Sequence, residues 1–209
     1  MNNIKNLLLD LGGVILNVDY NRTVEEFYKL NIRDFDKYFT QKQQTDIISS
    51  FEEGNISKQD FFSYIRKIAN NDFLTEKQID DAWFSMCLDV PNKVIHLLGE
   101  LKLKYNLYLF SNTNELHIYK LRKNMEETFG FDIFTMLFNK VYFSNEIHKR
   151  KPHVSSFQWV LNDAGILPEE TLFIEDSIQH IEGAKQAGLN TYWLTKGETL
   201  NDIYDKKII

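Results

Sequence analysis

The stretch of residues 7–14 decides the fold, and it reads Leu-Leu-Leu-Asp-Leu-Gly-Gly-Val. The largely apolar run of residues 4–9 predicts a short buried β-strand, because such a run, bounded by turn residues, is typical of a strand covered on both faces. Asp10 ends the run, and Gly12 and Gly13 follow, where glycine allows the backbone to bend sharply. A carboxylate therefore stands at the end of the first predicted strand.

Four later apolar runs resemble the first one, and helical patterns separate them. The runs cover residues 107–110, 141–143, 171–174 and 191–194. Helical patterns follow Asn114, extend over residues 152–164 and begin near Ser177, and Gly165 and Gly188 stand where the last two should end. This alternation predicts an α/β fold with a Rossmann-like parallel sheet, in which ligands bind at the carboxyl ends of the strands.

Residues 16–88 differ from the rest of the chain because they contain no convincing strand pattern. Apolar residues recur there at helical spacing, most clearly in residues 61–68 behind Ser57, a predicted helix N-cap. Thr75 with Gln78 three residues later is a capping-box pattern that opens another helix. We therefore expect an all-helical cap of residues 16–88, inserted into a core domain of residues 1–15 and 89–209.

The composition argues against several classes of function. The 209 residues carry a formal net charge of −6, and they lack the basic block that would bind nucleic acid or a membrane surface. A single cysteine excludes an intramolecular disulfide and a zinc site built from several cysteines. The N-terminal apolar run is too short for a signal peptide or a membrane span. We expect a cytoplasmic protein that binds neither nucleic acid nor membrane and is a monomer or weak homodimer.

Polar side chains stand at the ends of several predicted strands. Asp10 follows the first strand, Ser111 and Asn112 the second, Lys151 the third and Asp176 the fourth. In a parallel sheet these ends converge, so the side chains can share one pocket. Two carboxylates suit Mg²⁺, which prefers oxygen ligands, and the lysine and hydrogen-bond donors suit phosphate. Phosphoryl transfer needs little beyond such positioning and charge neutralisation.

Each of these features also has an ordinary structural interpretation. An isolated Asp-x-Gly-Gly is usually a turn, and Asp176 with Ser177 could simply cap a helix. Lys151 could be a solvated loop lysine in front of a proline that opens a helix. The functional interpretation is favoured because all four features occur in one chain, each after a predicted strand.

Taken together, these features resemble a known family, the haloacid dehalogenase superfamily with a helical cap of the C1 type. The matching segments are residues 7–14, 109–114, 150–152 and 173–184, in the family's order and spacing. Residues 51–57, followed by Phe61, resemble the cap of this group. Together with residues 17–22 and 111–117, they suggest the branch that includes bacterial α-glucose-1-phosphate phosphatase.

The resemblance implies a role for each matching residue. Asp10 would be the nucleophile and a Mg²⁺ ligand, with the Gly12 carbonyl and Asp176 as further ligands. The transferring phosphoryl group would be bound by Ser111 and Asn112, and its charge would be offset by Lys151. The implied function is hydrolysis of a small phosphomonoester, such as a sugar phosphate, through an aspartyl-phosphate intermediate.

The sequence departs from the family pattern at three positions. Gly12 stands where most phosphatases of the family carry an Asp that protonates the leaving group and then activates water, and Asp19 is a candidate substitute. Glu175 stands where Gly or Asp is more usual, and His180 where Asp or Asn is. The departures at Gly12 and His180 leave open a catalytically impaired relative that binds a phosphorylated ligand or a protein partner. A metal-independent dehalogenase acting on 2-haloacids is a further alternative.

Overall fold

Five parallel strands form the centre of the protein. The computed structural model describes residues 4–40, 45–195 and 197–209, so residues 1–3 of the predicted core and 41–44 of the predicted cap lie outside the described part. The strands are β1 (Asn6–Leu9), β2 (Asn106–Ser111), β3 (Lys140–Phe143), β4 (Thr171–Glu175) and β5 (Asn190–Trp193). Their order in the sheet is β3-β2-β1-β4-β5, and every neighbouring pair is parallel. The predicted Rossmann-like sheet is confirmed.

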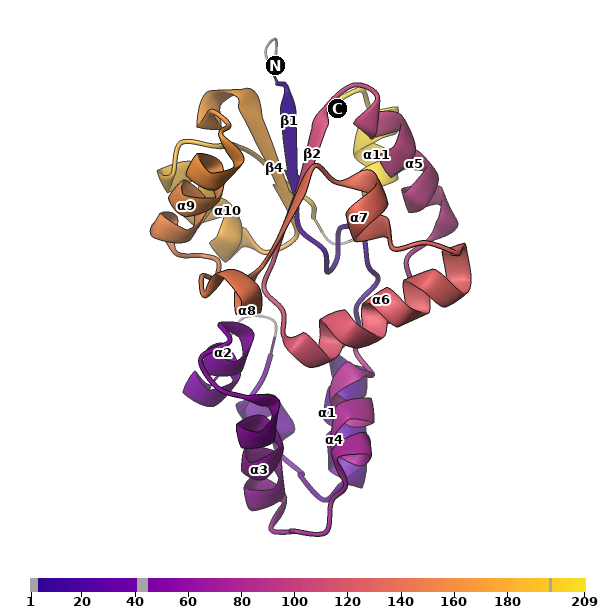
Figure 1. Ribbon diagram of the computed structural model, residues 1–209, viewed down its shortest axis with the longest axis vertical. Helices are drawn as coiled ribbons and strands as arrows, with labels where there is room; N and C mark the ends of the chain where they lie inside the picture. The colour runs from indigo at the N-terminus through magenta and orange to yellow at the C-terminus, as the bar shows by residue number, and fades with distance from the viewer. Residues whose placement is uncertain (1–3, 41–44, 196) are drawn as a thin grey trace.

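Helices cover both faces of this sheet. The core helices are α5 (Asn92–Lys102), α6 (Glu115–Phe129), α7 (Ile133–Leu137), α8 (Ser144–Ile147), α9 (Val154–Ala164), α10 (Ile178–Gln186) and α11 (Leu200–Asp205). Helices α9 and α10 lie on one side of the strands, and α5, α7 and α11 lie on the other (Figure 1). None of the helices in the described ranges is long and apolar enough to cross a membrane.

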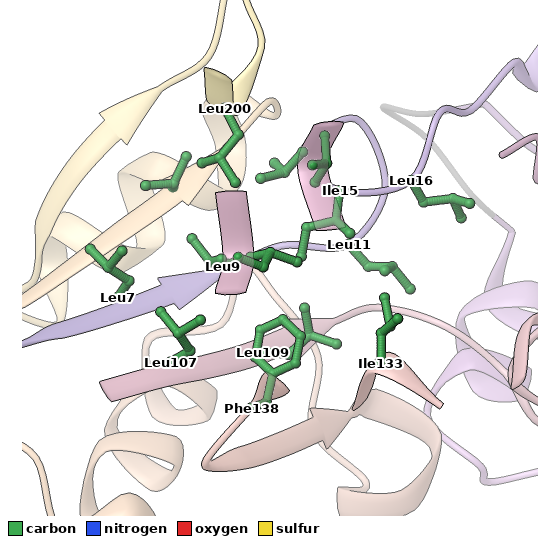
Figure 2. Close-up of a cluster of buried hydrophobic side chains, with 14 of the residues drawn as sticks. Leu7, Leu9, Leu11, Ile15, Leu16, Leu107, Leu109, Ile133, Phe138 and Leu200 are labelled. Atoms are coloured by element: carbon green, nitrogen blue, oxygen red, sulfur yellow. The ribbon is translucent and has the colours of Figure 1, made fainter. Parts of the chain in front are cut away.

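Alternation along β1 explains why both faces are covered. Leu7 and Leu9 belong to the buried cluster with α5 and α11, whereas Leu8 belongs to a second cluster with α9 and α10. Successive side chains of a strand point to opposite faces, so an unbroken leucine run needs an apolar layer on each side. Figure 2 shows the first cluster, which includes Leu7, Leu9, Leu107 and Leu200 of α11. This packing fixes where β1 ends and where Asp10 lies.

The helical cap forms a separate body below the sheet in Figure 1. It contains α1 (Tyr20–Lys29), a short 3-10 helix (Phe35–Lys37), α2 (Asp46–Glu52), α3 (Lys58–Ala69) and α4 (Glu76–Phe84). The predicted helix N-caps are confirmed: Ser57 is the N-cap of α3 and Thr75 is the N-cap of α4, each in a complete capping box. The cap has its own buried cluster, in which the rings of Phe35, Phe39 and Phe61 surround Trp83.

Two adjacent backbone connections join the cap to the core. They run antiparallel, with Asp19 N–H donating to the Met86 carbonyl at 2.9 Å and Leu88 N–H donating to the Asn17 carbonyl at 3.0 Å. Away from these connections, α4 packs against α6 and α2 packs against α8. The cap is thus held over the carboxyl ends of the strands, and we keep residues 16–88 as its proposed extent.

Candidate active site

A cavity of about 360 Å³ lies between the strand ends and the cap. Its lining includes every residue to which the sequence assigned a role in the site, namely Asp10, Gly12, Ser111, Asn112, Lys151 and Asp176. They come from the ends of β1, β2 and β4 and from the loop after α8. Residues separated by more than a hundred positions therefore face one space, as expected at the carboxyl edge of a parallel sheet.

Lys151 lies at the centre of the cavity floor and is fully buried. Its Nζ lies 2.7 Å from Asp10 Oδ1 and 2.6 Å from Glu175 Oε2. Burial alone would lower the pKa of Lys151, but the charges of Asp10 and Glu175 outweigh it and raise that pKa above its usual value. The lysine is therefore a permanent positive charge beside Asp10.

Three carboxylates converge on the same point. Asp10, Glu175 and Asp176 each offer an oxygen within 4.8 Å of the others. Burial, and then the negative charge of Glu175, raise the pKa of Asp10 well above its usual value in spite of Lys151. Such an arrangement of oxygen donors suits a divalent cation, whose charge would relieve the repulsion.

Gly13 makes the close approach of Asp176 possible. Its φ is +74°, and a Cβ at this position would overlap the Asp176 carboxylate. Only glycine satisfies both conditions without strain. The second glycine of the Asp-x-Gly-Gly stretch thus positions a proposed metal ligand that lies far away in the sequence.

The sequence matches the haloacid dehalogenase-like hydrolase family over residues 4–188. The chain belongs to this family. It is 30% identical, over 190 residues, to the D-ribitol-5-phosphate phosphatase of Bacteroides thetaiotaomicron, an alignment that covers 90% of this chain and 91% of the relative.

Solved structures of the family are also similar. A family enzyme from B. thetaiotaomicron, in complex with magnesium and inorganic phosphate, is 37% identical with a TM-score of 0.87, covering 96% of this chain and 99% of that one. A HAD-like hydrolase from Porphyromonas gingivalis is 26% identical with a TM-score of 0.87, covering 98% of each chain. The protein is thus an enzyme of the hydrolase class.

Asn112 fixes the loop that carries the lysine. Its Nδ2 donates to the Lys151 carbonyl and its Oδ1 accepts from the Lys151 N–H, each at 2.9 Å. These two bonds use the side-chain amide of Asn112 to hold the Lys151 backbone, which leaves Ser111 and the Asn112 backbone as the proposed contacts of a phosphoryl group. Ser111 is buried at the end of β2 and lines the cavity.

Glu175 is a site residue for which the sequence analysis predicted no role. It ends β4 fully buried and pairs with Lys151, and its Oε1 accepts from the N–H groups of Asp176 and Ser177 at 3.2 and 3.1 Å. Burial opposes its ionisation, but the charge of Lys151 and the hydrogen bonds with His180 and Lys151 hold the pKa of Glu175 below its usual range. A charged residue at the end of an otherwise apolar strand is the sequence signal that could have pointed to it.

His180 lies beside Glu175. Its Nδ1 lies 2.9 Å from Glu175 Oε2, and burial lowers the pKa of the ring although Glu175 opposes this. A neutral ring that donates from Nδ1 fits this contact. His180 therefore supports Glu175 from behind the carboxylate cluster, and Glu175 in turn orients Lys151.

The cap supplies the opposite wall of the cavity. Tyr20, at the start of α1, and Ser49 and Glu52 of α2 line it. Glu52 Oε2 accepts from Arg150 Nη2 at 3.0 Å, and Ser49 Oγ accepts from Arg150 Nη1 at 3.0 Å. The residue just before Lys151 therefore bonds to the cap.

Two other polar residues near the cap serve the fold. Asp19 caps α1, with its Oδ1 accepting from the Asn21 N–H at 3.1 Å, and it does not belong to the described lining of the cavity. His117 stacks on Trp83, and its Nε2 lies 3.1 Å from the Trp83 carbonyl. Burial lowers the pKa of His117 to about 4, so a neutral imidazole links α6 to α4.

Proposed function

We propose that the protein is a Mg²⁺-dependent phosphatase that hydrolyses a small sugar or polyol phosphate through an aspartyl-phosphate intermediate. One observation carries this proposal. Asp10 Oδ1 lies 2.7 Å from Nζ of the fully buried Lys151, and Asp10 belongs to a cluster of three carboxylates. These groups lie at the strand ends, in the cavity between the sheet and the cap. A carboxylate nucleophile beside a cation and a metal-binding cluster is suited to phosphoryl transfer.

Each residue then has a distinct task. A carboxylate oxygen of Asp10 attacks phosphorus, and Lys151 balances the charge that accumulates on Asp10 and on the phosphoryl oxygens. Mg²⁺, held by Asp10, the Gly12 carbonyl and Asp176, would neutralise further charge on the phosphoryl group. Ser111 and the backbone of Asn112 orient that group, while the cap limits the access of bulk water.

The substrate class follows from the cavity and from the relatives. Tyr20, Ser49 and Glu52 offer hydroxyl and carboxylate groups to the part of a substrate that extends toward the cap. Such groups match the hydroxyls of a sugar or polyol, and a similar enzyme is a D-ribitol-5-phosphate phosphatase. The α-glucose-1-phosphate phosphatase branch, a cytoplasmic location and a monomer or weak homodimer stay predictions.

Because Gly12 has no acid–base side chain, an alternative is that the protein is a catalytically impaired relative that binds a phosphorylated ligand or a protein partner. Loss of an acid–base group costs about 10²–10⁴-fold in rate, which would leave binding without turnover unless another residue compensates. A dehalogenase is less well supported, because that chemistry would leave the carboxylate cluster without a task.

The test is a panel of phosphomonoesters, including D-ribitol 5-phosphate, aldose phosphates and nucleotides, with Mg²⁺ or with a chelator. We expect phosphate release from polyol or sugar phosphates that requires Mg²⁺ and is lost in Asp10→Asn. Asp19→Asn is the matched control, because Asp19 caps α1 outside the described cavity lining. Binding of Mg²⁺ without turnover across the whole panel would favour the alternative, and halide release from 2-haloacids without Mg²⁺ would revive the dehalogenase.

A further inference from the structure

Hydrolysis of a sugar or polyol phosphate requires a proton for the leaving oxygen. An aliphatic alkoxide is about as basic as hydroxide, whose conjugate acid has a pKa of about 15.7, so unassisted departure is slow. Gly12 has no side chain to supply the proton. A Cβ at Gly12 would lie 3.3 Å from Val18 Cγ2, so the space beside Gly12 is already filled by an apolar side chain. The donor must therefore lie elsewhere on the wall of the cavity.

Apart from Tyr20 and the thiol of Cys87, whose pKa burial raises to about 12, the ionisable side chains that line the described cavity have tasks already. Lys151 and Glu175 bond to one another, and His180 bonds to Glu175. Arg150 and Glu52 form an ion pair at 3.0 Å. The Nε2 of His117 is held by the Trp83 carbonyl, and Asp10 and Asp176 belong to the proposed metal cluster.

Tyr20 is different. It is half-buried, it lines the cavity, and its hydroxyl makes no hydrogen bond to any residue in the described ranges. Its backbone is fixed as the first residue of α1, directly after the N-cap Asp19, and its ring packs on Phe39 with centroids 5.7 Å apart. The helix start and the ring contact thus place the phenol at the cap side of the site, with a hydroxyl that bonds to no residue in the described ranges.

Tyr20 lines the same cavity as the carboxylates of the site. Burial raises the pKa of Tyr20 well above its usual value, and the charges of Asp176, Asp10, Glu52 and Glu175 add to this. Four carboxylates of the site therefore act on one phenol, which stays protonated at neutral pH. A protonated phenol is still a far stronger acid than an aliphatic alcohol, so it can give its proton to a departing alkoxide.

We propose that Tyr20 donates the proton that the leaving oxygen requires and that Gly12, without a side chain, cannot supply. This inference rests on the proposed function. In the first step Asp10 forms a bond to phosphorus, the bond from phosphorus to the leaving oxygen breaks, and that oxygen takes the Tyr20 proton. In the second step water attacks phosphorus and gives a proton to the Tyr20 phenolate, while the bond from phosphorus to Asp10 breaks. Phosphate leaves, and both side chains return to their starting states.

Tyr20→Phe tests this because it removes only the hydroxyl. For the best polyol or sugar phosphate of the panel, we expect kcat/KM to fall by about 10²–10⁴-fold, the usual contribution of a general acid. For p-nitrophenyl phosphate, whose leaving group departs without a proton, kcat/KM should change only a few-fold. The aryl substrate should also give a burst of nitrophenol, because the phosphoenzyme loses the base that activates water.

Tyr28→Phe is the matched control, since Tyr28 lies on the same helix, is 58% exposed and is absent from the described lining of the cavity. It should leave kcat/KM unchanged for both substrates. An equal fall for both substrates in Tyr20→Phe, or no fall for either, overturns the inference. A leaving-group-selective loss in Glu52→Gln but not in Tyr20→Phe overturns it as well and assigns the proton to Glu52. Inactivity of the wild-type enzyme on every phosphomonoester would instead overturn the proposed function, and this inference with it.

Discussion

The two walls of the cavity are built in opposite ways. On the core side, Lys151, Glu175, Asp10 and His180 form a continuous chain of charged or polar contacts between 2.6 and 2.9 Å. On the cap side, aromatic packing around Trp83 holds a few polar groups over the site. The core wall thus fixes the reacting group, whereas the cap wall can vary with the substrate. Changes on the core side should abolish chemistry, and changes in the aromatic packing within the cap should alter stability with little effect on catalysis.

The largest effect is expected from Lys151→Met. Removal of the lysine leaves Asp10 and Glu175 buried without a counter-charge, and breaking a buried pair in this way costs about 3–5 kcal/mol. Turnover should be lost, and urea unfolding should show the destabilisation. Mg²⁺ should stabilise this variant more than the wild type, because the cation replaces the lost charge.

Lys149→Met, two residues away and only partly buried, is the control for both readouts. A Lys151→Met protein that is as stable as the wild type would mean that the buried pairs contribute little to the fold.

Gly13→Ala should act on the metal site. The added methyl group overlaps the Asp176 carboxylate, and the positive φ is unfavourable for alanine. Displacement of a ligand by its supporting shell typically costs about 10–100-fold in metal affinity, which calorimetric titration with Mg²⁺ would measure. Gly99→Ala should leave the affinity unchanged, since a Cβ there meets nothing within 4 Å. Unchanged Mg²⁺ affinity in Gly13→Ala would argue against Asp176 as a ligand.

His117 should make stability depend on pH at the junction of the two walls. Its pKa is lowered from 6.5 to about 4 by burial, so between these values the unfolded chain binds more protons than the folded one. Its contribution is complete above pH 6.5 and is lost as the pH falls toward 4. From pH 7 to pH 5 this amounts to a loss of about 2 kcal/mol.

His117→Gln keeps a hydrogen-bond donor but cannot titrate. Urea unfolding followed by tryptophan fluorescence should therefore show a smaller decrease in stability from pH 7 to pH 5 in this variant. An identical pH dependence in both proteins would mean that His117 is not the group responsible.

The smallest effect is expected from a substitution in the aromatic packing of the cap. Phe61 stacks on Phe51 with ring centroids 4.5 Å apart, and such pairs contribute about 0.5–1.5 kcal/mol beyond their buried area. Phe61→Leu should lower the unfolding free energy by about 1 kcal/mol, while kcat/KM for p-nitrophenyl phosphate stays within a few-fold. A loss of activity as large as that of Lys151→Met would remove the distinction between the two walls.

The same contrast explains how much could be predicted from the sequence. Apolar runs and turn residues are local signals, and they located all five strands and brought Asp10, Ser111, Lys151 and Asp176 to one edge. Helix α5 was missed, although Val94, Leu97, Leu98 and Leu101 recur at helical spacing. The pairing of Glu175 with Lys151 depends on how distant segments pack, which a local pattern does not reveal. The same holds for Tyr20, because nothing in the sequence near it shows that it lines the cavity.

The most direct test of the account is to identify the covalent intermediate. The enzyme would be mixed with substrate and Mg²⁺, quenched in acid during turnover, digested and analysed by mass spectrometry. The account predicts one phosphoryl group on the peptide that carries Asp10, released by hydroxylamine and absent from Asp10→Asn. Turnover that persists in Asp10→Asn, with no phosphorylated peptide in the wild type, would contradict it.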